Sequence, residues 1–175
     1  MKTTIRQHRA GIAFLSCSLL ILLDQLTKWL AARFLKGGSD LVVIPNVFEL
    51  HYLENVGVAF GILKNRQWLP ITFAAIIAVG FFVAYCKTSL KKQFLPLRIS
   101  MIGIISGAIG NMIDRIWHGY VIDFAYISLI DFPVFNLADC YIVLSIILLA
   151  ILVLFVYHEE ELQDAFIHKK THTSK

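Results

Sequence analysis

The sequence predicts an all-α membrane protein with four transmembrane helices and a small extracytoplasmic β platform between helices 1 and 2. Three observations support this fold class. Hydrophobic residues make up 58% of the chain, whereas soluble domains average about 45–50%. Charged residues make up only 16%, which is too few to coat a protein in water. The apolar residues also gather in four segments, each close to the roughly 20 residues that span a bilayer.

At this chain length, residues 1–157 are predicted to form a single transmembrane domain. The second and fourth segments contain no charged residue, while the first and third contain three each. A chain of 175 residues could not enclose four such helices in a soluble core, so we expect the helices to face lipid. The predicted spans cover about residues 12–35, 68–86, 97–117 and 141–157.

A strand pattern follows the first span, after glycines that end the helix. Phe48, Leu50 and Tyr52 recur at a period of two, which is typical of a half-buried strand. The β-branched segment 41–44 could pair with this strand through a Pro-Asn turn. We therefore expect a β platform over about residues 41–55.

Lys and Arg residues near the helix ends indicate the orientation. They precede the first span, cluster in residues 87–98 and close the chain, but none lies within 118–138. We expect both termini to be cytoplasmic and the 37–67 and 118–138 connections to be extracytoplasmic, in a bacterial inner membrane. Residues 158–175 then form a polar, solvated cytoplasmic tail. This topology explains the net charge of +4, and no basic stripe indicates a nucleic-acid partner.

Two aspartates lie at the facing ends of consecutive spans. Asp123 follows the third span and Asp139 precedes the fourth, so an antiparallel helix pair brings both carboxylates near the outer surface. Two carboxylates in one site share a single proton, because both cannot easily ionise. One can take a proton from water while the other hydrogen-bonds an amide carbonyl, which is aspartyl protease chemistry. Both residues fit helix-end carboxylates equally well, with Asp139 capping the fourth helix.

Other polar residues in the apolar segments also have structural explanations. Asp24 and Lys28 stand at i and i+4, the favourable order for a helical ion pair. A buried ion pair is likewise the favoured interpretation of Asp114. Ionisable groups at membrane depth are costly, however, so they are functional candidates by default.

Taken together, five segments resemble the conserved boxes of bacterial lipoprotein signal peptidase, the signal peptidase II family of aspartyl peptidases. They follow the family's order from the first span to the start of the fourth. Each box is weak alone, but five in order are highly specific. The segments are 24–28, 55–60, 107–115, 121–124 and 135–139.

The resemblance implies a membrane-embedded aspartyl endopeptidase. Such an enzyme removes the signal peptide from lipid-modified prolipoproteins by cutting before the diacylglyceryl-modified Cys. Its expected partners are diacylglyceryl-modified prolipoproteins and membrane lipids, and we expect a monomer without a cofactor or metal. The implied residues are Asp123 and Asp139 as the catalytic dyad, Asn55, Asn111, Arg115 and Asn136 in the substrate site, and Asp24, Lys28, Gly57, Asp114 and Ala138 in support.

A small proton- or ion-coupled transporter is the main alternative, because carboxylates within the membrane also serve proton relays. Transporters usually show internal repeats and sites at the bilayer midplane. This sequence shows no repeat, and its best carboxylate pair is predicted at one surface. An intramembrane protease of the presenilin type should contain a Gly-x-Gly-Asp box, which the sequence lacks.

Overall fold

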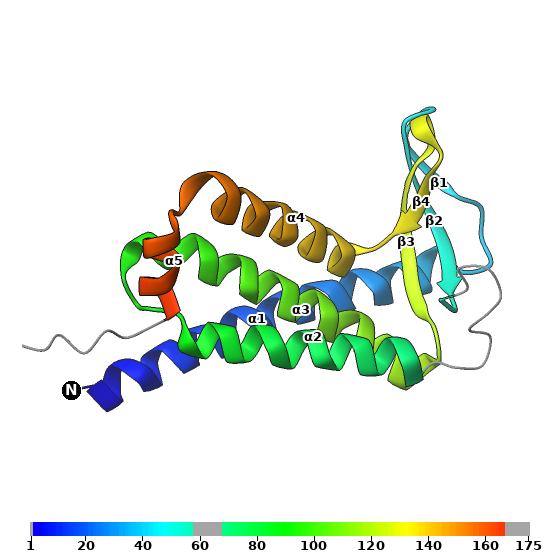
Figure 1. Cartoon of the computed structure of the whole chain (residues 1–175). Coiled ribbons are helices and arrows are strands. Elements are labelled where there is room, and N and C mark those ends of the chain that lie inside the picture. Colours follow the sequence, from blue (N-terminus) through cyan, green and yellow to red (C-terminus); the bar gives the residue numbers. More distant parts are fainter. Residues whose placement is uncertain (1, 58–67, 167–175) are drawn as a thin grey trace, which may run out of the picture.

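A computed structural model describes the backbone of residues 2–57 and 68–166, and the side chains of this part from residue 10 onward. Four long helices lie side by side (Figure 1). Within the described residues, these four are long and apolar enough to cross a membrane. Each of the four predicted spans therefore lies on a helix. The helices are α1 (Lys2–Phe34), α2 (Trp68–Lys87), α3 (Leu95–His118) and α4 (Leu137–Ile151), which continues into the π-helical turn η3 (Leu152–Val156). Helix α1 begins ten residues before the first predicted span, and the other bounds differ by no more than four residues when η3 is counted with α4.

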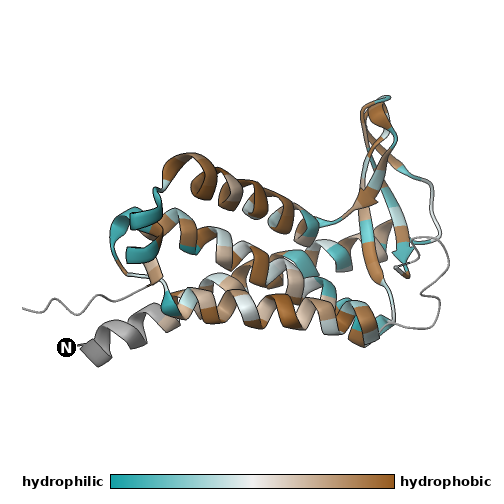
Figure 2. Ribbon diagram, in the orientation of Figure 1, coloured by the Kyte–Doolittle hydropathy of each residue, from teal (hydrophilic) through white to brown (hydrophobic). Residues whose placement is uncertain are grey.

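Helix α3 is the centre of the bundle and packs against α1, α2 and α4. Within the described residues, 61% of its most apolar stretch is buried, against 11% for each of the other three helices. The outward faces of those three helices are apolar, and α4 is almost entirely hydrophobic in Figure 2. This arrangement is expected of helices whose outer surface faces lipid.

Two close approaches of α3 depend on glycine. A Cβ atom at Gly107 would stand 2.5 Å from the backbone oxygen of Ala138 in α4. A Cβ atom at Gly110 would stand 2.5 Å from a carboxylate oxygen of Asp24 in α1. These glycines let the backbone of α3 reach both neighbours, as small residues commonly do between membrane helices.

A four-stranded antiparallel sheet lies across one end of the bundle (Figure 1). The predicted strands at 41–55 are present, and Asn46 at φ +58° forms the turn between them. The turn is closed by the Val47 N–H, which donates to the Ile44 carbonyl at 3.0 Å. In spatial order the strands are β1 (Leu41–Ile44), β2 (Phe48–Asn55), β3 (Val121–Ile127) and β4 (Phe132–Phe135).

The sheet is larger than predicted, because β3 and β4 come from the connection between α3 and α4. The platform therefore does not lie only between helices 1 and 2. Strand β3 pairs with β2 in a register that sets Leu53 opposite Asp123 and Asn55 opposite Val121. Residues 121–123 are all buried, so this segment lacks the alternation that reveals a half-buried strand. Asp123 therefore belongs to strand β3, which the sequence pattern did not predict.

The described part of the tail is mostly exposed or half-buried, but it is folded into a helix that the sequence analysis did not predict. Residues Glu159–Phe166 form helix α5 at the opposite end of the bundle from the sheet (Figure 1). Ala165 is fully buried and its carbonyl accepts a hydrogen bond from the Ser89 N–H at 2.7 Å. Lys91 forms an ion pair with Asp164. Helix α5 thus docks on the loop that follows α2 through Ala165 and Asp164.

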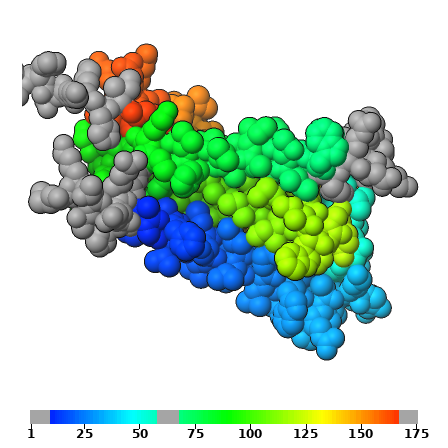
Figure 3. Space-filling model, turned by 90° about the horizontal axis from the view of Figure 1, so that it is seen from below, coloured from blue at the N-terminus to red at the C-terminus, as the bar shows by residue number. Residues whose placement is uncertain are grey.

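Between α1 and α2, helix α3 reaches the molecular surface (Figure 3). A cavity of about 430 Å³ lies among these three helices. Its lining is apolar and includes Ala13 and Cys17 of α1, Tyr85 of α2 and Ile105 of α3. This face is therefore suited to contact with lipid.

Candidate active site

Asp139 occupies the first turn of α4, and Asn136 is the N-cap of that helix. The two residues form a reciprocal capping box. The Asp139 N–H donates to Asn136 Oδ1 at 3.0 Å, and the Asn136 N–H donates to Asp139 Oδ2 at 3.1 Å. Asp139 therefore caps the helix, as the structural interpretation of the sequence predicted. Its other oxygen remains for a second partner, Asn111 of α3, whose Nδ2 donates to Oδ1 at 2.8 Å.

Asp123 lies on β3 and is 1% exposed. Asn136 Nδ2 donates to its Oδ1 at 2.6 Å, and Asn55 Nδ2 donates to its Oδ2 at 2.8 Å. Asn55 ends β2 and is held by the Gly57 N–H, which donates to its Oδ1 at 2.9 Å. Gly57 adopts a φ of +76°, a conformation that favours glycine. Gly57, which was expected to support the site, thus holds the side chain of a residue that donates to Asp123.

Each of the four carboxylate oxygens of Asp123 and Asp139 accepts one N–H bond from the protein. Asn136 links the two residues, since it donates its side-chain amide to Asp123 and exchanges hydrogen bonds with Asp139. The structure thus brings the predicted pair together in one site.

The electrostatics of Asp123 favour retention of a proton. Burial raises the pKa of Asp123, and the neighbouring charge of Asp139 raises it further. The amide donors of Asn55 and Asn136 oppose this rise because they stabilise the ionised carboxylate. Such a balance suits a pair of carboxylates that holds one proton between them.

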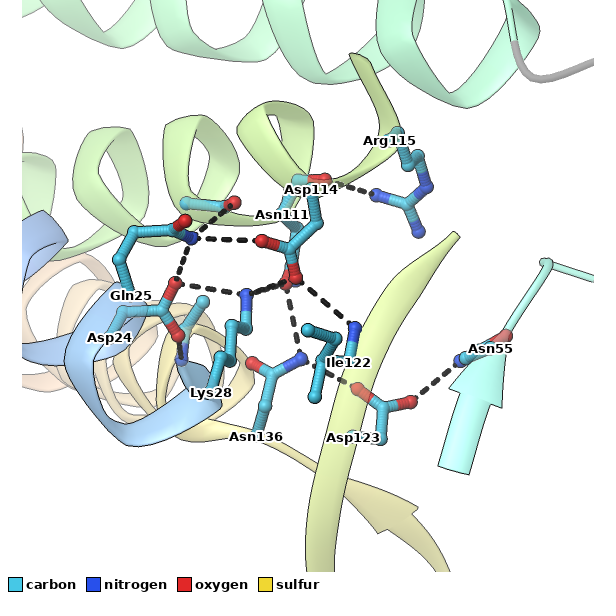
Figure 4. A network of polar contacts seen from close by, with 12 residues as sticks. Asp24, Gln25, Lys28, Asn55, Asn111, Asp114, Arg115, Ile122, Asp123 and Asn136 are labelled. Atoms are coloured by element: carbon cyan, nitrogen blue, oxygen red, sulfur yellow. Dashed lines mark hydrogen bonds and ion pairs between the residues drawn. The ribbon is translucent and has the colours of Figure 1, made fainter. Parts of the chain in front are cut away.

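A buried ion cluster lies next to Asn111 and Asn136 (Figure 4). Lys28 is 1% exposed, and its Nζ lies 2.9 Å from Asp24 Oδ2 and 3.0 Å from Asp114 Oδ2. Both ion pairs expected from the sequence are therefore present. Lys28 Nζ also donates to Asn111 Oδ1 at 2.9 Å, so the cluster contacts a residue that holds Asp139.

The two carboxylates of this cluster also hold the backbone beside the dyad. Asp24 Oδ1 accepts the Ala138 N–H at 2.9 Å, and Asp114 Oδ2 accepts the Ile122 N–H at 3.1 Å. Ala138 is fully buried. Asp24 therefore holds Ala138, the residue before Asp139. Asp114 holds Ile122, the residue before Asp123.

Gln25 is a member of this network that sequence reasoning did not single out. Its Nε2 donates to Asp114 Oδ1 at 2.9 Å, to Asp24 Oδ2 at 3.2 Å and to the Gly110 carbonyl at 3.2 Å. The available signal was an amide within an apolar span, three residues before Lys28 and hence on the same helix face.

Arg115 is half-buried and points away from Asp114, its neighbour in sequence (Figure 4). Its Nη1 donates to the Asn111 carbonyl at 3.4 Å. Its Nε is buried and has no hydrogen-bond partner among the described residues. Since a buried N–H without a partner is costly, this guanidinium is suited to a carbonyl supplied by a bound molecule.

Asn136, which was expected in the substrate site, makes side-chain hydrogen bonds inside the protein. Its Nδ2 donates both to Asp123 Oδ1 and to Asn111 Oδ1, the latter at 3.1 Å, and its Oδ1 accepts from Asp139. The side chain is 1% exposed, so its amide hydrogens are already used inside the protein. Asn55 and Asn111 donate one amide N–H each to the dyad, which leaves each a second N–H.

Comparison with known proteins assigns the family. The family model for signal peptidase (SPase) II matches residues 16–155, which is most of the chain and includes every residue of the site. The chain belongs to the signal peptidase II family. Membership makes the protein a multi-pass membrane peptidase of the aspartic type. It gives no support to the transporter alternative.

Individual signal peptidase II relatives agree with this assignment. The chain is 44% identical over 149 residues to the lipoprotein signal peptidase of Clostridium tetani, covering 82% of this chain and 91% of the relative. It is 44% identical over 137 residues to that of Clostridioides difficile, covering 78% and 90%. A solved structure described as a bacterial membrane enzyme superposes with a TM-score of 0.73 at 30% identity, over 84% of this chain and 95% of that one.

Proposed function

We propose that this protein removes the signal peptide from lipid-modified prolipoproteins, cutting before the diacylglyceryl-modified Cys. The observation that carries the proposal is the pair formed by Asp123 and Asp139, in which every carboxylate oxygen accepts one N–H bond. Family membership supports the substrate class, because the relatives are lipoprotein signal peptidases.

In the proposed reaction the pair holds one proton. One carboxylate accepts a proton from the attacking water, while the protonated partner hydrogen-bonds the scissile carbonyl. The water oxygen bonds to the carbonyl carbon, and collapse of this intermediate breaks the C–N bond as the leaving amine gains a proton. The titration belongs to the pair, so neither Asp123 nor Asp139 is assigned as the base alone.

Substrate binding is proposed for donors that remain available beside the pair. Arg115 carries the buried Nε without a partner among the described residues, and Asn55 and Asn111 each have a second amide hydrogen. These groups can hold peptide carbonyls, with bonds strengthened by the low dielectric of the site. The apolar outer faces of the helices suit acyl chains that approach laterally from the bilayer.

The proposed orientation places both termini in the cytoplasm and the sheet, with the dyad, at the extracytoplasmic face of the inner membrane. The basic residues of 87–98 support it. The sheet, whose strand β3 carries Asp123, lies at the opposite end of the bundle from this basic loop (Figure 1). We propose that the enzyme acts as a monomer, since one chain supplies both aspartates and the N–H groups that donate to them.

The test is cleavage of a diacylglyceryl-modified prolipoprotein by the purified protein, followed by mass spectrometry of both products. The same prolipoprotein without the lipid is the matched control. We expect a released signal peptide and a product that begins with the lipidated Cys, with the unmodified control left intact. Absence of cleavage by folded protein in a lipid environment would contradict the proposal, as would equal cleavage of the control.

A further inference from the structure

Lys28 of α1 is buried, and its ammonium group contacts three different residues. Its ammonium meets the carboxylates of Asp24 and Asp114 and the amide oxygen of Asn111, at 2.9, 3.0 and 2.9 Å. An ammonium has three N–H donors and no acceptor. All three donors are therefore used, and none of these contacts is with Asp123 or Asp139.

The Lys28 contact determines which way the Asn111 amide faces. Because an ammonium only donates, the Asn111 atom beside it must be the oxygen. The NH₂ group must then face the other way, where it donates to Asp139 Oδ1 at 2.8 Å. The Asn111 oxygen also accepts from Asn136 Nδ2 at 3.1 Å. Lys28 thereby directs an N–H donor at one member of the dyad.

The same logic extends to Asp123. The backbone N–H of Asp139 only donates, so the Asn136 atom beside it must be the oxygen. The Asn136 NH₂ group then serves both Asn111 Oδ1 and Asp123 Oδ1. The chain from Lys28 through Asn111 to Asp139 thus runs from donor to acceptor, and bonds in such a chain strengthen one another. Asn136 donates to the same Asn111 oxygen as Lys28 and, with its other N–H, to Asp123.

Lys28 also joins the two backbone segments that carry the dyad. Asp114 accepts the N–H of Ile122, the residue before Asp123. Asp24 accepts the N–H of Ala138, the residue before Asp139. Because Lys28 bridges the two accepting carboxylates, it ties the ends of β3 and α4 to each other across α1.

We propose that Lys28 is a positioning residue of the peptidase: it orients the Asn111 amide toward Asp139 and holds the segments that carry Asp123 and Asp139 in register. This inference rests on the proposed function. Without the ammonium, the Asn111 oxygen keeps only the Asn136 Nδ2 donor at 3.1 Å, so the amide turns its oxygen toward Asp139 more easily. The Asn111 oxygen and the ionised Asp139 carboxylate are both acceptors, so they can form a hydrogen bond only when Asp139 carries a proton. An Asn111 oxygen facing Asp139 therefore favours a protonated dyad.

The test begins with Lys28→Met, which keeps the length of the side chain and removes the donor. The charge-conserving pair Asp24→Asn/Lys28→Met leaves the cluster with its original formal net charge and is expected to recover part of the lost stability. Phe94→Ala is the control for stability alone, because Phe94 is fully buried near the α5 end of the bundle. The wild-type protein, assayed alongside, provides the reference rate.

All rates are measured per folded molecule, together with the pH profile. Among the described residues, the charged groups around the dyad are Asp24 and Lys28 of α1 and Asp114 and Arg115 of α3. We expect both Lys28 variants to lose about 100-fold in kcat, the scale of a small misplacement of reacting groups. Their KM should change less than kcat, since Lys28 is 1% exposed and reaches the substrate site only through Asn111. The acid limb of the profile should move to higher pH.

Phe94→Ala should lose stability but keep the wild-type kcat and pH profile. A double variant that turns over at the wild-type rate with an unchanged pH profile would overturn the positioning role and leave Lys28 structural. Folded wild-type protein that fails to cleave the prolipoprotein would instead overturn the proposed function, and the positioning role with it. The two failures are therefore distinguishable.

Discussion

Gly107 of α3 packs directly against the backbone of Ala138 in α4, so closely that a Cβ atom at position 107 would stand 2.5 Å from the Ala138 carbonyl oxygen. Ala138 immediately precedes Asp139. Four residues further along α3, Asn111 reaches Asp139 with a bond of 2.8 Å. The closeness of the two helices is therefore a condition for the hydrogen bond that holds this carboxylate.

Gly107→Ala should displace the start of α4, because the obstructing atom belongs to the backbone and cannot rotate away. Overpacking of this kind costs about 1–3 kcal/mol in stability. We expect a lower melting temperature in detergent and a larger loss of kcat than the unfolded fraction explains. Gly80→Ala on α2 is the matched control, since a Cβ atom added at position 80 would meet nothing within 4 Å. Equal activity of the two variants would contradict the prediction.

Asp123→Asn and Asp139→Asn should each abolish cleavage while leaving a folded protein that binds substrate. A single carboxyl group cannot act as base and also donate to the carbonyl oxygen, and such proton transfer contributes roughly 10²–10⁴-fold to rate. The measurement is product formation in a single turnover, with substrate binding recorded separately. Robust cleavage by either variant would remove that residue from the dyad.

The pH dependence follows from the raised pKa of Asp123, which has burial as its main cause. A carboxyl group with a raised pKa keeps its proton at higher pH, so the basic limb of the activity profile should lie above the usual Asp value of about 3.9. Asn55 lowers the pKa of Asp123 by donating to it. Asn55→Ala should therefore move the basic limb to still higher pH, and a shift to lower pH would contradict this account.

Asp24→Asn should lower stability through a conflict between donors. One Asp24 oxygen accepts the Ala138 N–H, and the other accepts from Lys28 and Gln25. An amide has only one acceptor atom, so whichever way it turns, its NH₂ faces another N–H. A buried group left unsatisfied costs about 1–3 kcal/mol. Chemical or thermal unfolding of the two proteins in the same detergent measures the difference, and equal stability would show that the site relaxes.

Much of this architecture could be predicted from local properties of the sequence. The spans follow from composition and length, and the ion pair of Asp24 with Lys28 follows from helical spacing. The convergence of Asp123 and Asp139 follows from the short connection between two antiparallel helices. Each of these inferences needs only residues that lie close together in the chain, which is why sequence alone supports them.

The features that were missed depend on contacts between distant segments. Strand β3 is defined by its pairing with β2, and the Asn55–Asp123 bond joins residues 68 positions apart. Helix α5 is held by burial of Ala165, which only the folded bundle provides. The use of both Asn136 amide hydrogens could not be foreseen either, because it requires the positions of Asn111 and Asp123 together.

The orientation of the bundle can be tested by labelling single cysteines at its two ends. Lys91, in the loop after α2, and Leu129, in the hairpin between β3 and β4, are both exposed to solvent and lie at opposite ends. In a background without Cys17, Cys86 and Cys140, a membrane-impermeant thiol reagent added to intact spheroplasts should label Leu129→Cys and spare Lys91→Cys. Both variants should react once the membrane is permeabilised, which controls for accessibility. Basic residues favour the cytoplasmic side, so labelling at position 91 in intact spheroplasts would reverse the proposed topology and place the dyad on the wrong face for secreted substrates.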